Sequence, residues 1–348
     1  MSDLAKWKVH GPVKTLRKEF ATWDLNTEAW QAAQHHTLTS FRADGKIGAS
    51  DAYNPDGSIA HSRWFYDDAG RLTESNSRMS DGMRDGPVSR TLYFYDEAGR
   101  HVRTAHLSQD GTQTDTEICT YDAGGKRTKV QFLSHPGVHT SCSIEGTDMG
   151  WSAPGATTMT TTYDEKDLPT KVLFRNANDN PLRYVTLTRD SAGRLLNVEL
   201  NLGGEPLFQE ITEKRPAEDR EGVAAMLKQI FDGTFSSTTH VYDTRGRMIE
   251  STHRMGTLGG DRTTYCYDED HDDPIEETTE HTSREAGIDE HGALKYSPGN
   301  VSIQHNRFDY VYDDHGNWTE RIVSIRPEPN TAFQRSNVER RAITYHDA

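Results

Sequence analysis

The sequence predicts an all-β protein, built as an extended, twisted antiparallel sheet of repeated β-hairpins that is partly rolled or barrel-like. A turn pattern, Tyr-Asp with a glycine three residues after the Asp, recurs along the 348 residues. Residues that favour β-strands precede most copies of this pattern. The hydrophobic content of 33% suits a thin core beneath a sheet with one wet face. We therefore expect a single domain over residues 1–348.

The turn pattern explains how the hairpins close. The Asp carboxylate accepts backbone N–H bonds from residues further along the turn, and the glycine supplies a left-handed backbone position at no steric cost. Together they predict a type I turn that closes with a glycine bulge, a common hairpin connection. The clear copies begin at Tyr66, Tyr95, Tyr121, Tyr242 and Tyr312, and the weaker ones at Tyr163, Arg189 and Tyr267.

The ends of the chain and the gaps between turns predict the remaining elements. Alternating residues at 13–20 predict a first strand, and 341–345 predict a last one. Long gaps between copies predict inserted loops at 131–157 and 281–305. Apolar residues at helical spacing behind Pro216 predict one covering helix near 217–231, and 26–33 is expected to form a second, short helix.

A row of large side chains accompanies the repeats. Two residues before several of the tyrosines stand other aromatic residues, and the period of two places both on one side of the sheet. This row is read either as the packed side of the sheet or as a platform that stacks on sugar rings or a partner chain. The candidate binding residues are Trp64, Tyr93, Tyr265 and Tyr310, together with Trp318 after the last turn and Trp151 in the first insert.

The densest run of charged residues covers 268–273. Its candidate ligands for a divalent cation are Asp268, Asp270, His271 and Asp272. The run departs from a calcium loop, because Asp273 stands where the sharp-turn glycine belongs and Thr279 where the bidentate Glu belongs. The alternative is a degenerate turn with a solvated acidic loop. No other cofactor is predicted.

Charge and composition narrow the classes of partner and location. A formal net charge of −15 argues against nucleic acid and membrane surfaces as partners. Three cysteines without a CxxC pair predict neither a disulfide framework nor a zinc site. We find no leader-like or membrane-spanning apolar run, which predicts a cytoplasmic protein, with export that needs no signal left open.

The repeated Tyr-Asp-x-x-Gly-Arg units resemble the YD-repeat, or RHS-repeat, family of bacterial proteins over residues 41–318. The resemblance implies long β-hairpin ribbons, which large members roll into a shell around a toxin, and carbohydrate binding by smaller arrays. This chain has too few repeats for such a shell. It also lacks the self-cleaving core, since Ile275-Glu276 follows Asp273-Pro274, and we expect no toxin domain. It therefore resembles a stand-alone member.

The sequence favours a binding or scaffold protein that holds a protein or carbohydrate partner with a sheet side and overhanging loops. A toxin-neutralising or toxin-associated role is one version of this prediction. The sequence contains no phosphate loop, GxGxxG, HExxH, GxSxG or CxxC, which argues against an enzyme. Two alternatives stay open: an enzyme with a His/carboxylate site inside the rolled sheet, and a structural repeat protein that assembles as a homo-oligomer.

Overall fold

The computed structural model divides the chain into two compact units. Unit 1 comprises Met1–Thr116 and His305–Ala348, and unit 2 comprises Glu117–Gln304. The residues that it describes are 3–347 apart from 34, 82–84, 135–140, 144–149, 154, 167, 203–215, 217–219, 221–223, 225–233, 289–293, 327 and 329. The unit boundaries fall within strands β9 (Gln113–Tyr121) and β23 (Asn300–Tyr312).

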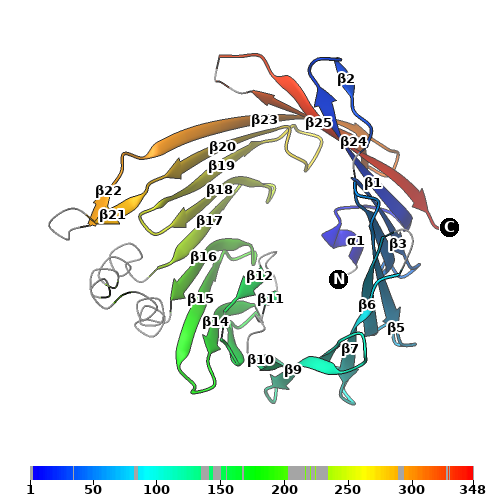
Figure 1. The fold of residues 1–348 in the computed structure, drawn as a ribbon, viewed down its shortest axis with the longest axis vertical. Coiled ribbons are helices and arrows are strands. Elements are labelled where there is room, and N and C mark those ends of the chain that lie inside the picture. Colours follow the sequence, from blue (N-terminus) through cyan, green and yellow to red (C-terminus); the bar gives the residue numbers. More distant parts are fainter. Residues whose placement is uncertain are drawn as a thin grey trace. The chain divides into compact units, whose positions relative to one another are not determined.

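Unit 1 is a sheet of antiparallel neighbours in the order β8, β7, β6, β5, β4, β3, β1, β25, β24 and β23. Figure 1 labels most of these strands. The order brings the first and last long strands side by side. Its elements are α1 (Asp3–Lys6), β1 (Val13–Asp24), β2 (Ala29–Trp30), β3 (His35–Phe41), β4 (Ile47–Tyr53), β5 (Ile59–Tyr66), β6 (Leu72–Ser80), β7 (Ser89–Tyr95), β8 (His101–Leu107), β24 (Trp318–Arg326) and β25 (Gln334–Tyr345).

Unit 2 continues the same pattern, with antiparallel neighbours in the order β10, then β13 through β20. Two small ribbons, β11–β12 and β21–β22, stand apart from this sheet. Its strands are β10 (Arg127–Ser134), β11 (Ser141–Ser143), β12 (Gly150–Ser152), β13 (Thr158–Tyr163), β14 (Pro169–Arg175), β15 (Pro181–Arg189), β16 (Leu195–Leu202), β17 (Ser236–Tyr242), β18 (Met248–Met255), β19 (Gly259–Cys266), β20 (Glu276–Ser283), β21 (Ala286–Ile288) and β22 (Leu294–Tyr296).

The all-β prediction is confirmed, and so is the turn chemistry behind it. Gly70 has a φ of 74°, and its N–H donates to the Asp67 carbonyl at 2.8 Å. The strand register shifts at Tyr66, which is the bulge that the glycine predicts. The predicted first and last strands are β1 and β25, and they pair with each other.

Successive turns of the repeat are joined by a contact that we call the turn clamp. In the turn 67–71 the Arg71 N–H and Nε donate to the two Asp67 carboxylate oxygens, at 2.8 and 2.7 Å. The Arg71 guanidinium lies over the ring of Tyr95 in the next copy, 5.1 Å from its centroid. The Tyr95 hydroxyl donates back to the Leu72 carbonyl at 2.9 Å. The Asp, the Arg and the Tyr of the motif thus each contact another residue of the sheet.

The same clamp recurs in unit 2. Arg194 lies over Tyr242 and Arg247 over Tyr267, at 5.0 and 4.6 Å. Each tyrosine hydroxyl donates to the carbonyl of the residue that follows the arginine, Leu195 in one case and Met248 in the other. The motif therefore determines the contact between neighbouring repeats as well as the hairpin turn itself.

Each unit has its own core on the side of the sheet that carries the motif tyrosines. In unit 2 the core covers β10 and β13–β16, where alternate residues such as Val172, Phe174 and Val185 are buried. Ala153 and Ala156, from the predicted insert 131–157, pack on it. The core of unit 1 gathers at the turn end of β1 and β3, and Leu4 and Trp7 pack against it.

One minor prediction is wrong, and another lies outside the described residues. Residues 26–33 form no helix, because β2 folds back on β1 and Trp30 meets the Trp23 ring edge-to-face at 4.8 Å. The covering helix near 217–231 lies outside the described residues, apart from two isolated positions. In the described part of the chain, no helix is long and apolar enough to span a bilayer.

Candidate functional site

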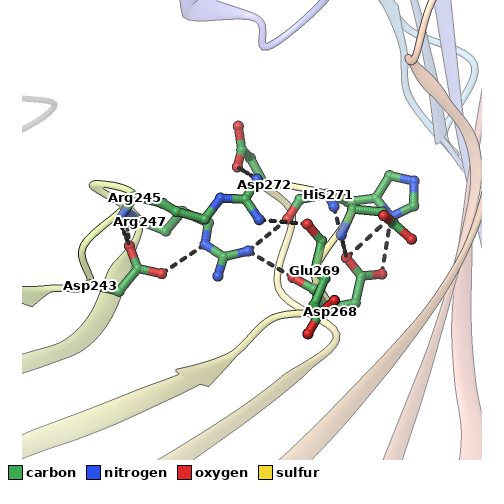
Figure 2. A network of polar contacts seen from close by, with 8 residues as sticks. Asp243, Arg245, Arg247, Asp268, Glu269, His271 and Asp272 are labelled. Atoms are coloured by element: carbon green, nitrogen blue, oxygen red, sulfur yellow. Dashed lines mark hydrogen bonds and ion pairs between the residues drawn. The ribbon is translucent and has the colours of Figure 1, made fainter.

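The acidic run 268–273 is the turn that follows β19, and the neighbouring turn holds it through two arginines (Figure 2). Arg247 binds Asp243 in its own turn at 2.8 Å and donates to the carbonyls of Asp268 and His271, at 2.8 and 3.0 Å. Arg245 donates to the Glu269 carbonyl at 2.6 Å. The run is thus part of a clamp between turns.

Two carboxylates of this turn, Asp268 and Asp272, have protein partners. Asp268 accepts the backbone N–H of His271 at 2.8 Å, and its other oxygen lies 3.0 Å from the His271 ring nitrogen. These bonds, first that of the His271 ring, hold the pKa of Asp268 below its usual range. Asp272 meets Arg245 at 3.3 Å, and Asp270 is exposed. Within the described ranges, no group of three or more His, Cys, Asp or Glu is placed to hold a metal ion.

Arg247→Ala is expected to lower the free energy of unfolding by about 2 kcal/mol. The change leaves the Asp243 carboxylate without its ion pair and two carbonyls without a donor. Urea denaturation followed by tryptophan fluorescence measures this loss. Arg254→Ala is the control, since Arg254 is exposed on the adjacent strand, and we expect a change within about 0.5 kcal/mol. Equal losses in the two variants would contradict the clamp.

The structure does not stack the predicted aromatic row ring on ring. Trp64 faces Ser75, and Tyr93 faces Thr104, because the return strand of each hairpin places a small hydroxyl side chain between the rings. The Tyr93 hydroxyl lies 3.3 Å from the hydroxyl of Ser75. In unit 1 the row is therefore half-buried rings alternating with hydroxyl groups.

Tyr310 and Trp318 do meet, with ring centroids 6.3 Å apart. Trp318 is only 5% exposed, so it is a packing residue with little free ring surface. Trp151 lies in β12, and its side chain is outside the described part of the structure. Tyr265 lies in β19 of unit 2 and is half-buried. Burial, and then the neighbouring Glu277, raise the pKa of Tyr265.

Around Tyr265 the strands β17–β20 bring together polar residues that are absent from the predicted binding and metal sites. Strand register aligns two rows of side chains on the same side as Tyr265, and we call these residues the polar face. One row is Thr238, His253, Asp261 and His281, and the other is His240, Ser251, Thr263 and Thr279.

Cross-strand contacts organise the polar face. His253 Nδ1 lies 3.0 Å from the Thr238 hydroxyl, and the hydroxyls of Thr263 and Thr279 are 3.1 Å apart. His281 Nδ1 is bonded to the Asp261 carboxylate. The side chains of both rows are partly or largely exposed to solvent, in contrast to the core over β13–β16.

One atom of the polar face has no hydrogen-bond partner among the described residues. His240 Nδ1 is buried from solvent and unbonded, and burial lowers the pKa of the His240 ring. Buried polar atoms are nearly always satisfied, so an unbonded one in a native structure calls for an explanation.

The Asp261–His281 pair has the composition of a general acid–base pair. Both side chains are about half exposed, at 45% and 54%, so the pair does not lie in a site that excludes water. Electrostatic catalysis gains its strength in dry, preorganised sites. The arrangement favours hydrogen bonding to a ligand over catalysis.

No family model matches the chain, and no curated protein is similar to it at a meaningful level. The solved structures that are similar to this chain include the following two. The TcdB2-TccC3-TEV structure is 12% identical with a TM-score of 0.38, over 91% of this chain and 15% of that chain. A porin-like protein from Bacteroides uniformis is 10% identical with a TM-score of 0.35, over 97% of this chain and 98% of that chain. This chain therefore spans 15% of the length of the first structure.

Proposed function

We propose that this protein is a binding protein whose polar face in unit 2 holds a carbohydrate. The observation that carries the proposal is the pair of polar rows beside the Tyr265 ring, with the unbonded His240 Nδ1 among them. Sugar hydroxyls both donate and accept hydrogen bonds. Imidazole, hydroxyl and carboxylate groups can match both roles.

The composition of the polar face favours a sugar over a protein partner. Protein interfaces depend on buried aromatic and aliphatic anchors at their centre. Here the aligned rows consist of hydroxyl, imidazole and carboxylate groups, and Tyr265 supplies an aromatic ring for the apolar side of a sugar. Hydroxyl pairs such as Thr263 and Thr279 can exchange their mutual bond for bonds to a ligand.

A glycan array, followed by calorimetric titration of the best glycan, tests the proposal. Tyr265→Ala is expected to weaken binding roughly tenfold, because it removes the ring. Tyr265→Phe keeps the ring and is expected to lose less. Thr264→Ala is the matched control, since the neighbouring residue of the same strand points to the opposite side of the sheet.

Two results would contradict the proposal. The first is the absence of any glycan that binds the wild-type protein. The second is an equal loss of affinity in the Tyr265→Ala and Thr264→Ala variants, because binding would then not depend on the polar face.

A further inference from the structure

A group of basic side chains in unit 1 lies on the same side of the sheet as Tyr310. Lys18 of β1 faces Arg341 of β25, and Arg321 of β24 faces Glu339 of β25. We call Lys18, Arg321 and Arg341 the cationic patch. All three are half-buried, although the chain as a whole carries a net charge of −15.

Aromatic rings hold the three cations in place. The Arg341 guanidinium lies 3.3 Å from the ring centroid of Trp318, and the Arg321 guanidinium lies 5.3 Å from it. The Lys18 ammonium lies 4.5 Å from the ring centroid of Trp7. Cations over aromatic rings are attracted to the ring face, so these contacts fix the positions of the three positive charges.

The charges that act on Lys18 are unbalanced. Burial, then the charge of Arg341, lower the pKa of Lys18 to about 8, while Glu339 acts in the opposite direction and Arg321 in the same one. Glu339 itself bonds Arg321 at 2.6 Å. The Nε of Arg321 is buried and makes no hydrogen bond among the described residues. Half-buried positive charge of this kind is costly unless a negative group neutralises it.

We propose that the cationic patch binds an oxyanion, namely a carboxylate or phosphate group carried by a small ligand. The Lys18 ammonium and the unbonded Nε of Arg321 provide donors for such a group, and the Arg341 guanidinium adds positive charge beside them. The patch lies in unit 1 and the polar face in unit 2, so this proposal is independent of the proposed carbohydrate binding.

Calorimetric titration of inorganic phosphate and of malonate into the full-length protein tests the proposal, with chloride holding the ionic strength constant. We expect saturable binding of at least one probe, and the tighter one identifies the class of oxyanion. Lys18→Met is expected to weaken that binding about tenfold, because one charged hydrogen bond is lost. Lys14→Met is the control, since Lys14 is exposed on the same strand.

Two further readouts separate binding from general damage to the fold. In chloride buffer near pH 7, Lys18→Met is expected to raise the thermal midpoint above that of the wild-type protein, because a desolvated cation beside two arginines is removed. Affinity in the wild-type protein is expected to fall as the pH rises through about 8, since Lys18 then loses its proton. The other charged groups that act on Lys18 are Arg341, Arg321 and Glu339. In Lys18→Met this pH dependence disappears.

The proposal is overturned if neither probe binds saturably, or if Lys18→Met and Lys14→Met bind the probe equally well. It is also overturned if Lys18→Met lowers the thermal midpoint in chloride, because the Lys18 side chain would then stabilise the fold without any bound oxyanion.

Discussion

Replacing Phe174 with alanine is expected to lower the free energy of unfolding by about 4 kcal/mol, the largest effect that we predict for a single side chain. Phe174 is 1% exposed and lies at the centre of the unit 2 core, where Val172 and Val185 are buried beside it. The core covers one side of a single sheet. The cavity left by the ring therefore has few other layers from which it could be filled.

Leu133→Ala is the matched control for Phe174→Ala. Leu133 lies in β10 of the same unit, directly after the buried Phe132, and is 49% exposed. We expect its loss to stay below about 1 kcal/mol. Urea denaturation measures both variants. Similar losses would show that the core does not lie on the side of the sheet that carries the motif tyrosines.

Asn317→Ala is expected to cost about 3 kcal/mol, the second-largest effect. Asn317 stands where four other copies of the motif have arginine, and it is 2% exposed. Its side chain accepts the His10 N–H at 2.6 Å and donates to the His10 carbonyl and the Tyr345 hydroxyl, both at 2.9 Å. Alanine would leave these part-buried groups without their partner and would loosen the N-terminal segment from the last turn.

The thermal midpoint and limited proteolysis of the N-terminal segment measure this effect. Asn26→Ala is the control, because Asn26 lies in an exposed turn of the same unit, and a change within about 0.5 kcal/mol is expected. An Asn317→Ala protein as stable as the control would contradict this prediction, because water would then replace the three bonds without lowering the free energy of unfolding.

The hairpin architecture is predictable from sequence because its causes are local. Asp67 and Gly70 lie within one turn, and the chemistry of each is enough to place the bulge and the two flanking strands. The first and last long strands of the chain are also predictable, since the alternation at 13–20 and 341–345 is a local pattern. The short helix at 26–33 failed because a tertiary contact, Trp23 against Trp30, overrode a weak local preference.

The candidate sites depend on strand register, which the sequence does not reveal. Asp261 lies between His253 and His281 only because β19 pairs with β18 and β20 in one particular alignment. A shift of one residue would turn Asp261 to the other side of the sheet. Lys18 and Arg341 are far apart in the chain and meet only because the first and last strands pair. The sequence predicts the aromatic row, but it does not predict that the return strands separate its rings.

The central claim is that the polar face of β17–β20 binds a carbohydrate, and the imidazole NMR signals of its histidines test it most directly. The experiment adds the best glycan from the array to protein labelled with ¹⁵N at histidine. We predict that the signals of His240, His253 and His281 shift together and saturate, while those of His10 and His315 in unit 1 stay in place. Saturable binding that leaves all three polar-face signals unmoved would contradict the claim.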